Sequence, residues 1–476
     1  MITLLLILLP LLTGLLCFTS KEAAKPMALA GAIATLGAAG WMLITAQSGA
    51  VTGFSVPWIP MLGASFTLHA DSSSVILVLL TALVMLTIFI AQWNKEIARP
   101  HAFYGLMMLA TAGLMGVFLA YDGLLFYAFW ELALIPVYFL CSQWGGPKRI
   151  TVTYKFFVYT FVGSLMMLAA LIFLSQRANG DFSWNALTTA GALLGSQEQS
   201  WIFVLLFLAF AVKMPIFPFH TWQPDTYEQS PTPVTIVLSA LMVKMGLFAA
   251  LRWLLPTVPL GVAYWADAVT ALCVIGIIYA SIIALMQTDL KRLIAYSSIA
   301  HMGLMATALF SGTQPSLAGL QVQMFTHGII ITGLWLLVSF IETRYGTRDM
   351  RELGGMASTM PKMAIALVIL AFANVSLPLT AGFPGEFLLF HGLFQSASNY
   401  SILFMILAGT SIIFGAAYTL RMVQKVAWGE PKTASVPGEV SLHDLSANEW
   451  LGLALMLALV IFLGFYPQPL LNLAGM

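Results

Sequence analysis

Charged residues are scarce in this chain of 476 residues: they make up 8% of it, whereas hydrophobic residues make up 60%. A water-soluble globular domain carries about 25% charged residues. A soluble core is therefore excluded, and we expect a membrane protein with many spans of about 20 residues each. The formal net charge of +1 gives no indication of a nucleic-acid partner.

Cysteines and phosphate-binding motifs are also sparse or missing. The three cysteines, Cys17, Cys141 and Cys273, lie in different apolar segments, and none belongs to a Cys-x-x-Cys or Cys/His cluster. A disulfide framework, a structural zinc site or an iron–sulfur cluster is therefore not expected in this chain. Nucleotide binding has no support either, because the chain has no Gly-rich phosphate loop and no Walker-type lysine. Whatever the chain drives, we expect the energy to come from elsewhere.

Long apolar segments make up most of the chain. The first, residues 4–18, is followed by Lys21 and Lys25 and preceded by no basic residue. That order is the reverse of a signal peptide, so we expect an uncleaved helix. We predict an all-α polytopic membrane protein with about 14 transmembrane helices. The other segments are 27–47, 73–92, 104–121, 123–143, 155–175, 201–220, 232–254, 265–287, 293–310, 317–340, 363–395, 401–427 and 448–466.

The basic residues alternate in step with this helix count. Loops after odd-numbered helices, with the helix ends beside them, hold 16 of the 20 basic residues, Lys432 among them. Loops after even-numbered helices hold only Arg177 and Arg252, and Lys213 and Lys244 lie inside apolar segments. By the positive-inside rule the odd loops face the cytoplasm. We therefore expect both termini outside, and we favour a cell inner membrane with the termini on its periplasmic side.

Two of the predicted helices are broken. Helix 7 is interrupted after Lys213 by Pro215 and Pro218, and helix 12 is interrupted in SLPLTAGFPGEF, just before Glu386. The breaks lie five helices apart, and an odd offset reverses orientation. We therefore predict two inverted five-helix repeats with a transport site near the membrane midplane; two unrelated proline kinks are the alternative. The predicted parts are 1–103 (helices 1–3), 104–254 (helices 4–8), 255–430 (helices 9–13) and 431–476 (helix 14).

Ionisable residues inside apolar segments are the candidate functional residues. A lysine at a helix centre costs about 2.5–3.5 kcal/mol to insert, so Lys213 and Lys244 indicate an ion or proton pathway. The alternative is a lysine that snorkels to the headgroups. Glu131 lies near the middle of its segment, and a carboxylate at that depth needs a partner such as either lysine; a structural hydrogen-bonded acid is the alternative.

Histidines add a possible relay. His301 and His327 lie inside apolar segments between Lys244 and Glu386 in chain order. Histidine exchanges protons near pH 7, so we interpret the pair as a relay, with satisfied interior histidines as the alternative. His220 lies beside the proline break and could instead face the cytoplasm. No role is assigned to His69, His101, His391 or His443.

These residues suggest a switch. In our hypothesis the approach of Glu131 holds a proton on Lys213, and withdrawal of Glu131 releases it. Pro215 and Pro218 would let the half-helix move. Moving one charge against the membrane field requires about 2.3 kcal/mol per 100 mV, and we expect conformational work to supply it.

Five segments carry a resemblance to a known family. They resemble the antiporter-like subunits of respiratory NADH:quinone oxidoreductase, complex I, and the likeness covers essentially the whole chain, most strongly residues 104–428. The segments are FWELALIPVYFL, AFAVKMPIFPFHTWQPD, TDLKRLIAYSSIAHMG, RDMRELGGM and GFPGEF.

The resemblance implies roles for the same residues. It implies that Glu131 and Lys213 form a modulating ion pair and that Lys244 passes protons toward the centre. It also implies that His301 and His327 belong to a central hydrated axis, with Glu386 as the terminal exchange residue. No redox cofactor is implied in this chain, because FMN, the iron–sulfur clusters and the quinone belong to partner subunits.

Within the family the chain is most similar to M-type members. L- and N-type members, the implied neighbours in the membrane, have a lysine where this chain has Glu386. Many members have a histidine in a W-L-P-D-A-H pattern where this chain has Tyr227 in WQPDTY, so the resemblance does not support a proton path through that loop. A subunit of a multi-subunit Na⁺/H⁺ antiporter, a subunit of an energy-converting membrane hydrogenase and a passive scaffold are the alternative functions. The combined insertion cost of four buried ionisable residues, about 10–14 kcal/mol, argues against a scaffold.

Overall fold

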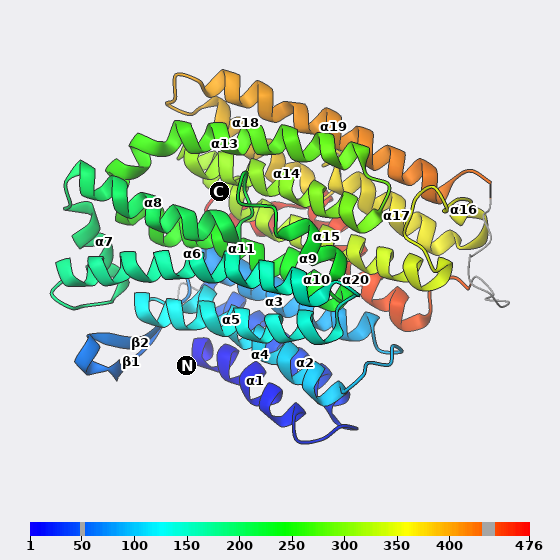
Figure 1. Cartoon of the computed structure of the whole chain (residues 1–476), viewed down its shortest axis with the longest axis horizontal. Helices are drawn as coiled ribbons and strands as arrows, with labels where there is room; N and C mark the ends of the chain where they lie inside the picture. The colour runs from blue at the N-terminus through cyan, green and yellow to red at the C-terminus, as the bar shows by residue number, and fades with distance from the viewer. Residues whose placement is uncertain (48–52, 431–442) are drawn as a thin grey trace.

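The computed structural model describes residues 1–47, 53–430 and 443–476. Its helices run side by side along the longest axis of the molecule (Figure 1). Within the described residues, eleven helices are long and apolar enough to cross a membrane. They are α2 (Ala24–Gln47), α3 (Ser72–Ala91), α4 (Pro100–Leu119), α5 (Gly123–Trp144), α6 (Arg149–Arg177), the continuous α10–α12 (Thr232–Thr257), α13 (Pro259–Met286), α14 (Leu290–Ser311), α15 (Gln314–Tyr345), α19 (Ser401–Ala427) and α20 (Ala447–Phe465).

The remaining predicted segments correspond to shorter helices. The first is α1 (Ile2–Cys17). Predicted helix 7 is α8 (Ser196–Lys213), which ends at Lys213, and the chain becomes helical again in α9 (Gln223–Gln229). Predicted helix 12 is divided into α17 (Pro361–Asn374) and α18 (Gly382–Phe394). The all-α membrane fold and both helix breaks are therefore confirmed, while the inverted repeat stays a prediction.

A short β-hairpin is the element that the sequence analysis missed. Strands β1 (Gly53–Ile59) and β2 (Ala64–His69) are antiparallel and are joined by the 3₁₀ turn η1 (Pro60–Leu62). This stretch lies between the predicted segments 27–47 and 73–92, and the sequence analysis assigned no element to it. The hairpin is a two-stranded sheet with no further strand beside it in the described residues. The other short elements are α7 (Trp184–Ala192), α16 (Met356–Thr359) and α21 (Gln468–Leu473).

The two ends of the helix bundle differ. The hairpin and α7 lie at one end and α16 at the other (Figure 1). The marks for both chain termini lie in the half that carries the hairpin and α7. The side of the membrane that the two termini face stays a prediction.

Aspartates define where several spans begin. The Asp71 carboxylate accepts a hydrogen bond from the Ser74 N–H (2.8 Å) at the start of α3, and Asp122 and Asp289 cap α5 and α14 in the same way. Such a cap satisfies an amide that the first helical turn leaves unpaired, and is typically worth about 1 kcal/mol. The polar residue before each apolar run is thus the local reason that the helix begins there.

The span from Thr232 to Thr257 is not a regular α-helix, although the sequence predicted a plain one. Two π-helical stretches, which are frequent at functional sites, lie on either side of Lys244. In order, the span consists of α10 (Thr232–Ile236), the π-helix η2 (Val237–Met242), α11 (Val243–Ala249), the π-helix η3 (Ala250–Leu254) and α12 (Leu255–Thr257).

An arginine fastens α20 to α15. The Arg344 guanidinium contacts both carboxylate oxygens of Glu449, at 2.6 and 3.2 Å, and also donates to the carbonyl oxygens of His443 and Asp444. The Arg344 and Glu449 side chains are only 13% and 18% exposed. A bidentate pair of this kind is among the stronger polar contacts in proteins.

Arg344→Ala should therefore lower the free energy of unfolding by about 1.5–3 kcal/mol, the range for hydrogen bonds to charged groups. The check is a lower thermal unfolding midpoint of the purified protein in detergent. Arg351→Ala is the control, because the Arg351 side chain is 68% exposed and pairs with Asp349 on the surface; it should leave the unfolding midpoint unchanged. Equal midpoints for the two variants would contradict the prediction.

Candidate functional site

Lys213 occupies the C-terminal end of α8, where the helix breaks. Its side chain is 2% exposed, and its ammonium has no hydrogen-bond partner among the described residues. The Nζ atom lies 5.5 Å from the ring centroid of Trp130 and 6.0 Å from that of Phe156. Contacts between a cation and an aromatic face contribute about 0.5–2 kcal/mol each, so two aromatic rings hold this charge where no oxygen does.

A glycine brings the second lysine helix against this break. A Cβ atom at Gly246 of α11 would lie 2.7 Å from the Met214 backbone nitrogen and 2.8 Å from the Phe210 carbonyl oxygen. Phe210 lies in the last turn of α8, and Met214 directly follows the helix. The missing side chain therefore allows α11, which carries Lys244, to pack directly on the backbone beside Lys213.

Glu131 lies on α5, next in sequence to Trp130, and is half-buried. The Glu131 carboxylate and the Lys213 ammonium interact electrostatically. They do not form an ion pair within 4.0 Å, although both residues are described. The structure thus holds the predicted pair apart, the arrangement in which our hypothesis has Lys213 free to release its proton.

Lys244 and His327 are in direct contact. Lys244 is fully buried, and its Nζ lies 2.8 Å from Nδ1 of His327 and donates to the Ser239 carbonyl oxygen at 2.7 Å. Ser239 belongs to the π-helix η2, and His327 lies in the middle of α15. With the lysine protonated, the imidazole nitrogen is the acceptor, so a proton can pass along this hydrogen bond.

His301 extends the line from α14. The rings of His301 and His327 have centroids 5.4 Å apart and are tilted by 56°. The Nε2 atoms of both histidines are buried without a protein partner among the described residues. Buried polar atoms of this kind are typically satisfied by internal water, which suits a hydrated relay.

Glu386 lies in the first turns of α18, directly after the second helix break. Glu386 is 7% exposed, and it shares with His301, Asn374 and Tyr418 the lining of a cavity of about 10 Å³, roughly the space for one water molecule. Asn374 is the last residue of α17, so the helix break leaves it in the lining of the cavity. The Asn374 Nδ2 donates to Ser297 Oγ (3.2 Å), which is 2.9 Å from the Tyr418 hydroxyl.

His220 is separate from this line. It is 3% exposed and lies in the chain segment after Lys213. Its ring lies 5.8 Å from that of Phe217 and 5.3 Å from that of Tyr279. The structure therefore places it beyond the break, among aromatic residues, and does not bring it to the central lysine and histidines.

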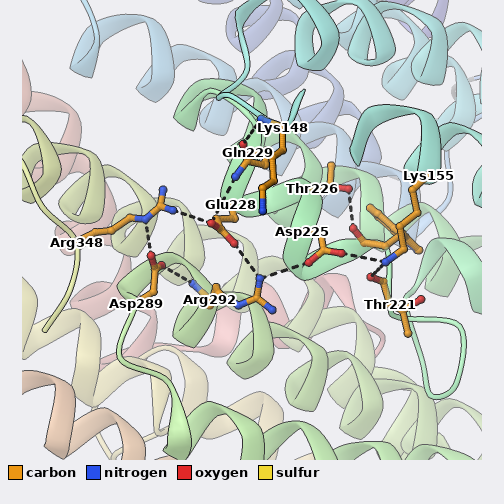
Figure 2. Close-up of polar contacts among 11 residues, drawn as sticks. Lys148, Lys155, Thr221, Asp225, Thr226, Glu228, Gln229, Asp289, Arg292 and Arg348 are labelled. Carbon is orange, nitrogen blue, oxygen red and sulfur yellow. Dashed lines mark hydrogen bonds and ion pairs between the residues drawn. The ribbon is translucent and has the colours of Figure 1, made fainter. Parts of the chain in front are cut away.

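An ionic cluster anchors α9, the short helix between the two lysines (Figure 2). Asp225 of α9 binds Lys155 (3.0 Å) and Arg292 (3.4 Å), and Glu228 of α9 binds Arg292 and Arg348 (both 2.8 Å). Arg348 also binds Asp289 at 2.5 Å. The cluster ties α9 to α6, to α14 and to the loop after α15, so the segment that follows the break is held at this end.

Comparison with known proteins gives the family. A family model described as NADH:quinone oxidoreductase/Mrp antiporter, TM, matches residues 120–415. The chain is 35% identical to NADH-quinone oxidoreductase subunit M of Escherichia coli (strain K12), over 98% of this chain and 95% of that protein. The chain belongs to the subunit M family of NADH-quinone oxidoreductase.

Solved structures agree with this assignment. A chain of respiratory complex I from Thermus thermophilus with bound NADH superposes with a TM-score of 0.89 at 30% identity, over 100% of this chain and 98% of that chain. A chain of the Mrp complex from Dietzia sp. DQ12-45-1b superposes with a TM-score of 0.85 at 23% identity, over 100% of this chain and 52% of that chain. The second likeness shows a shared fold alone.

Membership of the subunit M family confirms the resemblance drawn from the motifs, and the roles of individual residues stay predictions. The sequence analysis did not identify Ser297, Asn374 or Tyr418. The sequence could have pointed to Asn374, because it is a polar residue in an apolar segment just before a predicted break. It could not have pointed to Ser297 and Tyr418, since only the fold brings α14 and α19 to the cavity. Lys432 lies outside the described residues.

Gly246→Ala should displace the end of α8, because the added methyl group would meet the Met214 and Phe210 backbone. Overpacking of this kind costs about 1–3 kcal/mol, and here it also moves Lys213. We expect a lower unfolding midpoint and lower NADH-driven proton pumping. Gly409→Ala in α19 is the matched control, because a Cβ there meets nothing within 4 Å. Equal behaviour of the two alanine variants would show that the close approach at Gly246 is not required.

Proposed function

We propose that this chain is a proton-translocating membrane-arm subunit of NADH-quinone oxidoreductase, and that quinone reduction in partner subunits drives protons through its buried Lys, His and Glu residues. The observation that carries the proposal is the buried contact of 2.8 Å between Lys244 and His327. This contact joins a lysine to a histidine and not to a carboxylate. A carboxylate beside the lysine would hold the proton on the ammonium more tightly than the imidazole does, so the lysine–histidine contact suits proton transfer.

The proposed path has two parts joined near α11. Glu131 and Lys213 form the modulating pair at the first helix break. Lys244, His327 and His301 form the relay, and Glu386 at the second break is the exchange group. Support comes from the tilted rings of His301 and His327, 5.4 Å apart, and from the cavity shared by His301 and Glu386.

The switch would act through the position of α9. Movement of the segment after Lys213 changes the distance between Lys213 and the Glu131 carboxylate, and with it the proton affinity of the lysine. The ionic cluster fixes one end of this segment, so motion would concentrate near the break. In this proposal His220 has no part in the central relay.

The assembly follows from the same proposal. L- and N-type antiporter-like subunits are the proposed neighbours, and FMN, the iron–sulfur clusters and the quinone site belong to partner subunits. The proposed location is the cell inner membrane with both termini on the periplasmic side. The excess of basic residues in odd-numbered loops supports this orientation.

Lys213→Ala should abolish coupled proton pumping while the complex still assembles, because the path loses its modulated proton carrier. The measurement is NADH-driven acidification of inverted membrane vesicles, with assembly checked by native gel. Lys362→Ala is the control, since Lys362 is exposed at the start of α17, and it should pump like the wild type. Pumping near the wild-type rate in an assembled Lys213→Ala complex would overturn the proposed mechanism and leave the family assignment intact.

A further inference from the structure

A second cavity lies at the end of the bundle that carries the β-hairpin and α7. Its volume is about 490 Å³, and it lies between the start of α3, the end of α4 and the end of the Lys244 helix. Its lining includes His69, Asp71, Phe248 and Arg252. In the proposed orientation this end faces the periplasm.

Arg252 is a buried cation inside a predicted span. Its position falls within the predicted segment 232–254, near the end, and it was counted with the loop that follows; the structure places it in the π-helix η3, 6% exposed. It forms an ion pair with Asp71. Its Nη2 donates to Ser74 Oγ (2.7 Å) and its Nη1 to the Phe118 carbonyl oxygen (3.2 Å), while its Nε has no partner among the described residues.

Lys244, Phe248 and Arg252 follow one another along the same helix at intervals of four residues. Residues spaced in this way share a face and are separated by about 6 Å along the axis. Phe248 is fully buried and lines the cavity, whereas Lys244 does not. The cavity therefore ends about one helical turn from Lys244, and the Phe248 ring occupies that turn.

Arg252 and Phe248 are in contact. The Arg252 guanidinium carbon lies 4.4 Å from the Phe248 ring centroid, and the Phe248 ring packs edge-on against Phe118 at 5.3 Å. The ion pair with Asp71 fixes the guanidinium, and the guanidinium in turn covers the ring. An arginine at a constriction also repels incoming cations, as in other membrane pores.

The charges that line the cavity favour this closed arrangement at neutral pH. Burial raises the pKa of Asp71, but the attraction of Arg252 and the hydrogen bonds from Ser74 outweigh it and hold the pKa below its usual value, so the carboxylate is ionised. Burial lowers the pKa of the His69 imidazole, which is therefore neutral and adds no charge. Arg252 is the cation that faces Asp71.

We propose that this cavity is an outward-facing proton vestibule of Lys244, closed by the Phe248 ring and by the Arg252–Asp71 ion pair. The inference rests on the proposed function, because it takes Lys244 as a proton carrier. When Phe248 swings aside, the Lys244 ammonium gives its proton to water in the vestibule instead of to His327, so the vestibule is a branch of the path beside the relay to Glu386. Arg252 stays protonated and prevents cations from entering in the reverse direction.

The test is passive proton leak without NADH. The purified complex is reconstituted in vesicles, a pH gradient is imposed under a valinomycin/K⁺ clamp, and a trapped pH dye reports its decay. Arg252→Gln and Phe248→Ala should each increase the leak several-fold over the wild type. Adding Lys244→Ala to either variant should return the leak to the wild-type rate, because the path then lacks its carrier.

Arg177→Gln is the control variant. It removes an exposed ion pair with Glu198 at the same end of the bundle and should leave the proton leak unchanged. If Arg252→Gln prevents assembly, the exchange D71R/R252D keeps the pair and should show a wild-type leak, while Phe248→Ala still opens the path. A wild-type leak in assembled Arg252→Gln or Phe248→Ala, or a leak that persists without Lys244, overturns the proposal. The passive leak does not require Lys213. A failure of the proposed pumping mechanism would therefore appear in the NADH-driven test of Lys213→Ala and not in this leak measurement.

Discussion

The cost of placing charge in a low-dielectric interior is the constraint on which this structure depends. Lys213, Lys244 and Arg252 are all at least nine-tenths buried, and each needs a compensating group. The compensation differs from one to the next. Arg252 has a full ion pair, Lys244 has a carbonyl and an imidazole, and Lys213 has only aromatic faces in contact and a carboxylate at a distance. The two groups proposed to carry protons are thus the two that lack a direct ion pair.

Where a helix is broken, polar groups become available that an intact helix would use in its own hydrogen bonds. The break after Lys213 ends α8 beside the aromatic rings, and the break after Asn374 leaves this residue in the lining of the cavity that Glu386 also lines. The π-helical turn before Lys244 carries the carbonyl that accepts from its ammonium. Irregular backbone at membrane depth is tolerated where it is buried in protein or lines a water-filled cavity, and all three irregularities meet the line of ionisable residues.

Much of this could be predicted from the chain itself, for definable reasons. Apolar runs of membrane length predict the transmembrane helices. Proline and glycine inside two of these runs predict the helix breaks after Lys213 and before Glu386. The contact of Lys244 with His327 could not be predicted, since 83 residues separate them and only helix packing brings them together. The same holds for Tyr418. Arg252 was counted with the loop that follows its segment because charge alone does not show that Asp71 lies beside it.

In the proposed mechanism, a hydrated relay through His327 and His301 connects Lys244 to Glu386. The most direct test is a high-resolution electron-microscopy structure of the whole complex in lipid, with ordered water resolved around His301. We expect water hydrogen-bonded to the Nε2 atoms of His301 and His327 and in the cavity beside Glu386, so that each neighbouring pair of groups is bridged. A dry, apolar gap between His301 and Glu386 in every resolved state would contradict it.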